Sequence, residues 1–316
     1  MAIGGIDIGG TKIGVCLGDT DGSVLAGETI ATADHPDPAA LLGVCLERLD
    51  ALRGKHDVSI ESIGVAVPGP YDRMERRFLD PPNMPAWHGF GIGAWLDERA
   101  PAACRVMNDA NAAAYAEWLW GHERGAHTLV FLTMSTGLGA GIVIEGRVLE
   151  GERGLGGEIG RVRLSEDGPV GFGAYGTAEA WASGSGIRQM AETEALRCMQ
   201  AGEATALHDV DVLDARAVCE AASRGDRAAL RVVAQSAVRL GQLIGLLANV
   251  LEPQAVVLGT IGVAFPDLFV GPAFEEAKRH AVSATMERLR VSASSLEHRW
   301  ERQALAAGLY GREVRA

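Results

Sequence analysis

The amino-acid sequence predicts an α/β protein built from two lobes. The chain has 316 residues, and a domain usually takes about 100–200 residues, so two lobes are expected. A strand, a loop of small residues and a second strand occur near residues 3–17 and again near residues 128–144. This weak internal repeat indicates that both lobes contain the same hairpin. Hydrophobic residues make up 47% and charged residues 22% of the chain, which is typical of a globular protein.

The first part of the chain is predicted to be mostly strands. Apolar runs bounded by glycine, proline and aspartate indicate strands. After Asp37-Pro38, apolar residues recur at helical spacing, and proline suits the first turn of a helix. The predicted strands cover residues 2–8, 13–17, 24–32 and 63–67.

The rest of the chain adds a second strand-rich stretch and then helices. Residues 105–107 form a short predicted strand, and the alanine-rich residues 111–120 form a helix. Further strands are expected at residues 128–134, 142–144 and 255–258, with mostly helix in the remainder beyond residue 175. We expect residues 1–118 plus 302–316 to form the N-terminal lobe and residues 119–301 the C-terminal lobe.

Composition and charge argue against several classes of function. The net charge of −12 would repel a nucleic-acid backbone. The five cysteines contain no Cys-x-x-Cys pair, so neither a disulfide framework nor a cysteine-rich metal site is indicated. The N-terminus lacks the basic region of a signal peptide, and no apolar run approaches the roughly 20 residues that span a bilayer. A cytoplasmic protein without nucleic-acid or membrane partners is expected.

The first glycine loop follows the first strand. Glycines let the backbone approach an anion closely, and Thr11 and Lys12 add a hydroxyl and a positive charge. The carboxylate of Asp7 would repel a bare phosphate. Its presence beside a phosphate-binding loop is therefore expected only if Mg²⁺ lies between the two groups. A plain hairpin turn explains the same residues equally well. The predicted nucleotide-binding residues of this loop are Asp7, Gly9, Gly10, Thr11 and Lys12.

The second glycine loop, with Thr136 and Gly137, favours the functional interpretation of the first. Two such hairpins could hold the phosphates of a nucleotide from two sides. Neither loop has the Gly-x-x-x-x-Gly-Lys-Ser/Thr spacing of a P-loop. The first loop is followed by a strand and not by a helix, so it is not a dinucleotide-binding fingerprint.

Asp109 follows a short strand and precedes a helix, and two interpretations fit it. Aspartate is frequent at the N-cap of a helix. Carboxylates at the ends of strands also gather in the sites of α/β folds, and a phosphoryl transfer needs a base near the attacking hydroxyl. Glu158, in a glycine-rich loop, and Glu179, at a helix start, could accept hydrogen bonds from sugar hydroxyls. The alternatives are a bond to the backbone for Glu158 and helix-dipole stabilisation for Glu179.

Taken together, these segments resemble the ROK family of repressors, open reading frames and kinases, almost from end to end. The resemblance rests on an ordered set of motifs. They are Asp7-Ile8-Gly9-Gly10-Thr11-Lys12, Pro68-Gly69-Pro70, Pro82-Asn83-Met84-Pro85-Ala86-Trp87, Asn108-Asp109-Ala110-Asn111-Ala112-Ala113-Ala114 and Ser135-Thr136-Gly137-Leu138-Gly139-Ala140-Gly141.

The resemblance implies a two-lobed actin-like ATPase (ribonuclease H-like) fold with the active site in the interlobe cleft. It implies a glucokinase-like transferase of carbohydrate metabolism that uses ATP and Mg²⁺ and phosphorylates a hexose or amino sugar, most often at the C6 hydroxyl. Asp109 would be the catalytic base, and Asp7 would hold Mg²⁺ indirectly. A homodimer is also implied. The residues expected to hold the sugar are Gly69, Asn83, Asn108, Asp109, Glu158 and Glu179, and Gly259 is expected beside the nucleotide.

The chain departs from the family's zinc motif. Most members use a histidine and three cysteines for a structural zinc ion, and all four positions are replaced here, by Arg161, Val170, Phe172 and Thr177. This set lacks the nitrogen and sulfur ligands that zinc prefers, so no zinc is expected. Val170 and Phe172 are expected to form a small hydrophobic cluster instead.

Two replacements bear on the substrates. Arg161 stands where the family histidine touches the sugar. It is therefore a candidate for binding a hydroxyl, an anionic group or an acyl group of the sugar. The alternative is that Arg161 forms an ion pair with Glu158 or Glu166. Thr260 and Ile261 interrupt glycines beside the adenosine, so a different phosphoryl donor such as polyphosphate is possible.

Two rival functions remain open. Family repressors carry a DNA-binding domain before the first loop, which begins here at Asp7, so a DNA-binding repressor is not expected. A non-catalytic sugar sensor or regulator without that domain fits the altered zinc and adenosine segments, whereas the retained Asp7, glycine loops, Asp109 and Glu158 argue against it. An actin-like ATPase of the chaperone or filament type explains the glycine loops, but not the Asn108-Asp109 segment.

Overall fold

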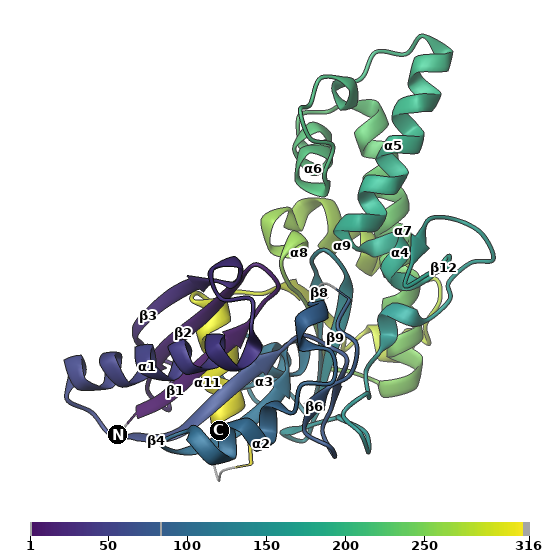
Figure 1. Ribbon diagram of the computed structural model, residues 1–316. Coiled ribbons are helices and arrows are strands. Elements are labelled where there is room, and N and C mark those ends of the chain that lie inside the picture. Colours follow the sequence, from purple (N-terminus) through teal and green to yellow (C-terminus); the bar gives the residue numbers. More distant parts are fainter. Residues whose placement is uncertain (1, 83, 312–316) are drawn as a thin grey trace. The chain divides into compact units, whose positions relative to one another are not determined.

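The computed structural model describes residues 2–82 and 84–311 and has the mixed α/β architecture that the sequence predicts (Figure 1). The chain divides into two compact units. The first unit contains residues 1–125, 141–157 and 296–316, and the second contains residues 126–140 and 158–295. The lobe boundaries that the sequence predicts, after residue 118 and before residue 302, stay predictions.

The first unit is built on a five-stranded sheet. Its order is β3-β2-β1-β4-β7. The first three strands form an antiparallel meander, and β4 and β7 continue the sheet parallel to β1. The strands are β1 (Ala2–Ile8), β2 (Lys12–Gly18), β3 (Val24–Ala31), β4 (Ile60–Val67) and β7 (Ala103–Asn108).

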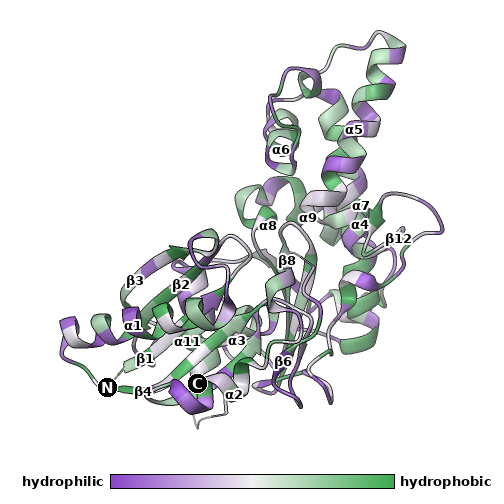
Figure 2. Ribbon diagram, viewed as in Figure 1, coloured by the Kyte–Doolittle hydropathy of each residue, from purple (hydrophilic) through white to green (hydrophobic). Residues whose placement is uncertain are grey.

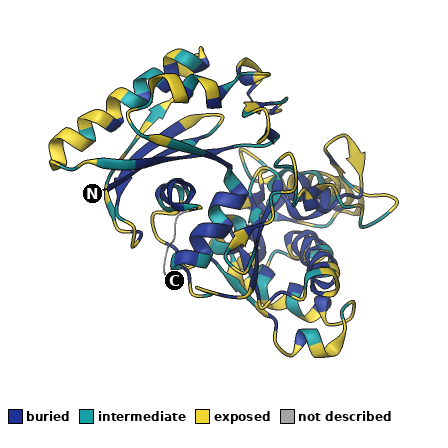
Figure 3. Ribbon diagram, turned by 90° about the horizontal axis from the view of Figure 1, so that it is seen from below, coloured by how far each residue is buried: buried dark blue, intermediate teal, exposed yellow. Residues whose placement is uncertain are grey.

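Two helices cover opposite faces of this sheet. A Cβ atom on Gly4 would meet Leu49 of α1 (Pro38–His56), and one on Gly5 would meet Ala304 of α11 (Arg299–Leu309). Consecutive strand residues point to opposite faces, so these contacts place the two helices on different sides. Figure 3 shows the difference in burial: the outer side of α1 is exposed, whereas α11 is enclosed.

Further elements of the first unit flank the sheet. Helix α3 packs against α11. Figure 2 shows mixed hydrophobic and hydrophilic residues along α1, as its exposed position requires. The remaining elements are α2 (Ile92–Arg99), α3 (Asp109–Trp120), β5 (Tyr71–Asp72), β6 (Arg77–Phe78), β10 (Arg147–Val148) and the 3₁₀ helices η1 (Thr32–Asp34) and η2 (Pro85–Trp87).

A second five-stranded sheet has the order β10-β9-β8-β13-β14. Strand β13 pairs in parallel with both β8 and β14. The first residues of β9 belong to the second unit, and the strand continues into the first unit from Gly141. The strands are β8 (Thr128–Met134), β9 (Leu138–Ile144), β13 (Ala255–Leu258) and β14 (Arg290–Ala293).

The second unit is rich in helices, of which α7 is the longest. By length and composition α7 could cross a membrane, but 56% of its apolar window is buried inside the protein. It packs against α4, α5, α6 and α9, as a core helix does. The elements are α4 (Ala178–Ala182), α5 (Gly184–Ala201), α6 (Ala215–Ser223), α7 (Arg227–Leu251), α8 (Ile261–Ala264), α9 (Pro266–Ala277), α10 (Ser283–Met286), β11 (Val170–Gly171), β12 (Ala174–Tyr175), η3 (Ile159–Arg161) and η4 (Ala206–His208).

Candidate functional site

Three parallel strands of the first unit end at one edge of its sheet. In the β1–β4 pairing Asp7 lies opposite Ala66, and in the β4–β7 pairing Val67 lies opposite Asn108. Asp7 and the Asn108-Asp109 pair are therefore separated by a single strand at the carboxyl ends of these strands. This is the edge at which ligand sites form in α/β sheets.

The N-cap of α3 is Asn108 and not Asp109. The side-chain oxygen of Asn108 accepts hydrogen bonds from the N–H groups of Ala110, at 3.0 Å, and Asn111, at 3.2 Å. Asp109 is the first helical residue, is half-buried, and accepts the Ala110 N–H at 2.7 Å. The N-cap role considered for Asp109 is therefore filled by its neighbour Asn108.

Asp7 has an unusual electrostatic environment. Burial raises the pKa of its carboxyl group from 3.8 to about 7. A hydrogen bond at 2.5 Å from the side-chain amide of Gln303 on α11 lowers this pKa, the charge of Asp109 raises it, and Lys12 lowers it. The charge of Asp109 thus acts on Asp7 from the neighbouring strand end. Gln303 is a site residue that the sequence did not reveal.

The first glycine loop closes on its own hairpin. The Gly9 N–H donates to the carbonyl oxygen of Lys12 at 3.1 Å, and the Thr32 N–H donates to that of Thr11 at 3.0 Å. Gly10, Thr11 and Lys12 are exposed, so they are open to a ligand. The segment is thus a hairpin turn, as one interpretation held, and it also presents the groups that the other interpretation requires.

The second glycine loop is held by other segments of the second unit. The Gly184 N–H donates to the carbonyl oxygen of Ser135 at 2.7 Å, and the Leu138 N–H donates to Oε2 of Glu179 at 3.1 Å. A Cβ atom on Gly137 would lie 2.6 Å from the same Oε2 atom, so a larger residue there would push this carboxylate aside. Glu179 is therefore part of the support of this loop.

Glu179 is buried, with 9% of its surface exposed, and burial raises its pKa. Hydrogen bonds from the N–H groups of Leu138 and Phe172, and the charge of Arg161, lower that pKa in part, whereas Glu158 raises it. Glu179 also lies in the first turn of α4, where a negative charge is favourable. Both interpretations of Glu179 thus fit its position.

Glu158 and Arg161 belong to the same group of charges. Glu158 precedes η3 but makes no side-chain cap bond to it. Partial desolvation raises the pKa of its carboxyl group, although the residue as a whole is exposed, and Arg161 lowers it. In the described part of the chain Arg161 forms no ion pair within 4.0 Å; its guanidinium carbon lies 4.2 Å from the centroid of the Phe172 ring.

Val170 and Phe172, at two of the family's four zinc positions, do not form the expected hydrophobic cluster. Val170 is 37% and Phe172 41% exposed, so that expectation is wrong, because the ring of Phe172 packs under Arg161 instead. Thr177 caps α4 by accepting the Ala180 N–H at 3.1 Å. Within residues 2–82 and 84–311 no group of three His, Cys, Asp or Glu residues could hold a metal ion.

The other predicted residues lie in separate places. Gly69 follows β4, is half-buried and precedes Pro70 in a cis peptide. Gly259 is buried after β13, and a Cβ atom on it would lie 2.5 Å from the ring of Phe131. Thr260 has a φ of 46°, which is strained for a β-branched residue. Asn83 lies outside the described residues.

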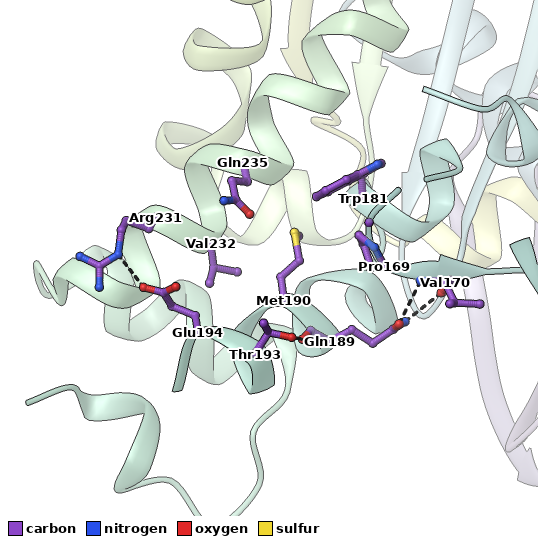
Figure 4. Close-up of a pocket in the computed structure, with 11 residues that line it drawn as sticks. Pro169, Val170, Trp181, Gln189, Met190, Thr193, Glu194, Arg231, Val232 and Gln235 are labelled. Atoms are coloured by element: carbon purple, nitrogen blue, oxygen red, sulfur yellow. Dashed lines mark hydrogen bonds and ion pairs between the residues drawn. The ribbon is translucent and has the colours of Figure 1, made fainter. Parts of the chain in front are cut away.

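A cavity of about 470 Å³ lies in the second unit among α4, α5 and α7. None of the predicted site residues lines it. Figure 4 shows Trp181, Met190 and Val232 at the cavity, with an ion pair between Arg231 and Glu194 at its rim.

Comparisons with known proteins identify the family of the chain. The sequence model of the ROK family matches residues 3–303. A glucokinase of Halalkalibacterium halodurans is 32% identical over 259 residues, which cover 81% of this chain and 78% of the relative. An N-acetylmannosamine kinase of Escherichia fergusonii is 33% identical over 261 residues, which cover 82% of this chain and 83% of the relative.

Solved structures show the same similarity. A ROK hexokinase from Thermus thermophilus has a TM-score of 0.81 at 30% identity, covering 98% of this chain and 97% of the other. A ROK glucokinase from Streptomyces griseus, in complex with glucose and AMPPNP, has a TM-score of 0.77 at 26% identity and 98% coverage of both chains. A ROK transcriptional regulator, a homologue of the Escherichia coli MLC protein, has a TM-score of 0.84 at 25% identity, covering 97% of this chain and 77% of the other.

Proposed function

Because the chain belongs to the ROK family and is a sugar kinase with the two-lobed actin-like ATPase fold, we propose that it transfers the γ-phosphoryl group of ATP to the C6 hydroxyl of a hexose or amino sugar. The observation that carries this proposal is the position of Asp109. Its carboxylate lies at the carboxyl end of β7, one strand away from Asp7, and the capping of α3 falls to Asn108.

In the proposed reaction Asp109 takes the proton from the sugar hydroxyl as the oxygen attacks the γ-phosphorus, and the bond from that phosphorus to the β–γ bridging oxygen breaks so that ADP leaves. Phosphoryl transfer needs alignment and charge stabilisation more than covalent chemistry, so a well-placed carboxylate suffices as the base. The first loop (Gly9, Gly10, Thr11 and Lys12) and the second (Thr136 and Gly137) donate to the phosphates, and Gly259 lies by the nucleoside.

The sugar would be held by groups with complementary hydrogen bonding. The carboxylates of Glu158 and Glu179 accept from hydroxyls, and the guanidinium of Arg161 donates to an oxygen. Gly69, Asn83 and Asn108 complete the proposed set. The cap bonds of Asn108 use its side-chain oxygen, so its amide NH₂ is the group that would meet the sugar.

The donor set fits Mg²⁺ of the kind that accompanies nucleotides. Mg²⁺ in kinase sites keeps several waters and takes one or two carboxylates together with substrate phosphates, so it needs no cage of protein ligands. Asp7, near the first loop, would hold it through water, and the ion would neutralise phosphate charge. The Gln303 amide keeps the Asp7 carboxylate in place.

Zinc is not part of the proposal, because the side chains of Arg161, Val170, Phe172 and Thr177 supply no thiolate or imidazole. Metal analysis of the purified protein is expected to find less than a tenth of an equivalent. One zinc ion per chain would contradict this.

The proposed setting is the cytoplasm, with a homodimer as the assembly and with neither nucleic acid nor membrane as a partner. The charge of −12 supports the exclusion of nucleic acid.

ATP is the proposed phosphoryl donor. Polyphosphate is the second candidate, because Thr260 and Ile261 add bulk beside Gly259 and a solved polyphosphate/ATP-glucomannokinase from Arthrobacter shares the fold.

The test is a coupled assay of hexoses and N-acetylhexosamines with ATP or polyphosphate, on the wild type and on Asp109→Asn. Loss of a general base usually costs about 10²–10⁴-fold in rate. We expect kcat to fall by at least about 10³-fold, with sugar affinity by calorimetry within about threefold of the wild type. Near-normal turnover in the variant would show that Asp109 is not the base.

The similarity to a ROK transcriptional regulator favours a second candidate, a sugar sensor without catalysis. A sensor would bind a sugar but would not consume the phosphoryl donor in its presence. Sugar-dependent ADP formation by the wild type, abolished in Asp109→Asn, would exclude it.

A further inference from the structure

The hairpin β11–β12 has an unusual turn. Val170 pairs with Tyr175 and Gly171 with Ala174, which leaves Phe172 and Gly173 as the two central residues. Both have positive φ, 51° and 72°. Two-residue turns of this kind normally carry Asn-Gly or Gly-Gly, and a bulky side chain at positive φ is a genuine outlier. Such strain persists where neighbouring structure imposes it, often near a functional site.

The contacts of Phe172 show what that strained conformation achieves. The residue is 41% exposed, so burial in the core does not explain its conformation. The ring instead lies against the guanidinium of Arg161, 4.2 Å from centroid to carbon, and the Phe172 N–H donates to the carboxylate of Glu179. The turn thus contacts two of the three charged side chains assigned to the sugar.

The base of the hairpin is fastened from behind. The side-chain oxygen of Gln189 on α5 accepts the Val170 N–H at 3.0 Å, and its NH₂ donates to the Val170 carbonyl oxygen at 2.8 Å (Figure 4). A Cβ atom on Gly171 would lie 2.8 Å from the backbone nitrogen of Ala180, so β11 lies directly on α4. The turn is therefore held at a fixed place relative to Glu179, which lies on the same helix.

Arg161 has little else to orient it. It is exposed, and no ion pair within 4.0 Å is found for it in the described part of the chain. An exposed arginine side chain has many rotamers, and ordering it costs conformational entropy. Stacking on an aromatic face restricts the guanidinium plane, while its N–H groups lie in that plane, point sideways and stay available to a ligand.

We propose that Phe172 is a positioning residue that holds the Arg161 guanidinium beside Glu158 and Glu179, so that this group selects sugars carrying an acceptor-only oxygen. A guanidinium has donors and no acceptor, whereas the two carboxylates only accept. The carboxylates suit hydroxyls, and the guanidinium suits the carbonyl oxygen of an acylamino group or a carboxylate. This inference rests on the proposed function, because it places these three side chains at the sugar.

Phe172→Asn is the sharpest variant, because asparagine tolerates positive φ and keeps the turn while removing the ring. We expect its thermal stability to equal or exceed that of the wild type. Loss of a stacked cation is worth about 1–1.4 kcal/mol, so the KM for an N-acetylhexosamine should rise about five- to tenfold. The kcat and the KM for ATP should stay within about twofold.

Three further variants separate a positioning role of Phe172 from a general structural role. Phe172→Tyr keeps an aromatic face and should retain the wild-type KM, whereas Phe172→Leu keeps an apolar side chain and should behave like Phe172→Asn. In the double variant Arg161→Ala/Phe172→Asn, the Phe172 change should add nothing, because the group that it positions is gone.

Failure of this inference is distinguishable from failure of the proposed function. An active wild type whose sugar KM is unchanged in Phe172→Asn would overturn the positioning role alone. If the wild type phosphorylates no sugar, the proposed function is wrong, and calorimetric binding of N-acetylglucosamine and N-acetylmannosamine then decides. Equal affinities in wild type and Phe172→Asn, or no binding by either, would overturn the positioning role as well.

Discussion

The two glycine loops are fastened to the protein in different ways. The first closes through bonds within its own meander, from Gly9 to Lys12 and from Thr32 to Thr11. The second is supported from outside its hairpin, by Gly184 at the start of α5 and by the carboxylate of Glu179. Glu179 is also a proposed sugar ligand. If Glu179 binds the sugar as proposed, a change in the first loop should leave sugar binding intact, whereas a change in the support of the second loop should affect both substrates.

The largest effect that would separate the two loops is expected from Glu179→Gln. The amide cannot replace all the acceptors of a carboxylate, and hydrogen bonds to charged groups contribute about 1.5–3 kcal/mol each. We expect kcat/KM for both sugar and ATP to fall, by about 10²-fold or more for the sugar, as measured by steady-state kinetics with each substrate varied.

The matched change in the first loop is Thr11→Val, which removes an exposed hydroxyl and keeps the side-chain shape. The KM for ATP should rise about tenfold, as the loss of one hydrogen bond to a charged group predicts, with the sugar KM unchanged.

If Glu179→Gln altered only the KM for the sugar, the bond from the Leu138 N–H to Glu179 would have no role in nucleotide binding.

A smaller effect concerns the acid beside the first loop. Asp7 has a pKa of about 7 because of burial, and the Gln303 bond lowers that pKa. Mg²⁺ requires the charged carboxylate, so the concentration of Mg²⁺ for half-maximal activity should rise as the pH falls from 8 to 6. In Gln303→Leu the rise should begin at a higher pH and reach about tenfold at pH 6.5. In Asp7→Asn the dependence should vanish.

The same shift affects stability, with a defined sign. The pKa of Asp7 is higher in the folded protein than the 3.8 of an ordinary carboxyl group. The folded state therefore binds the proton more tightly, and the contribution of Asp7 to the free energy of unfolding is fully present below pH 3.8 and is lost as the pH rises through about 7. Urea unfolding without Mg²⁺ should show this loss in the wild type and not in Asp7→Asn; an equal pH dependence in both would contradict it.

The sequence was sufficient for the parts of the site that follow from local patterns. Asp7 lies near the end of the first apolar strand and Asp109 follows Asn108 just after a short strand, so their place at strand ends could be predicted, as could the two glycine hairpins. Gln303 could not, because it reaches Asp7 across 296 residues of sequence. A hydrogen bond between segments so far apart leaves no periodic signal in either of them.

The hairpin around Phe172 shows a different limit. Apolar residues at the replaced zinc positions predicted a cluster, because burial is the usual fate of phenylalanine and valine. The positive φ of Phe172 turns its ring towards Arg161 instead. Backbone conformation at a single turn residue decided the outcome, and hydrophobicity alone carries no information about it.

The smallest predicted effect concerns Thr260, which follows Gly259 in the second unit. Its φ of 46° is unfavourable for a side chain branched at Cβ. Such strain costs on the order of 1–3 kcal/mol, and glycine loses about 0.5–1 kcal/mol through its freer unfolded state. The free energy of unfolding of Thr260→Gly should therefore rise by about 1 kcal/mol in urea titrations, while Thr260→Ala, which keeps the Cβ atom, should gain less. If both variants gained equally, the side chain and not the backbone would carry the strain. An unchanged KM for ATP in Thr260→Gly would mean that the strain has no part in holding the nucleotide, whereas a raised KM would show that the strained backbone helps to hold it.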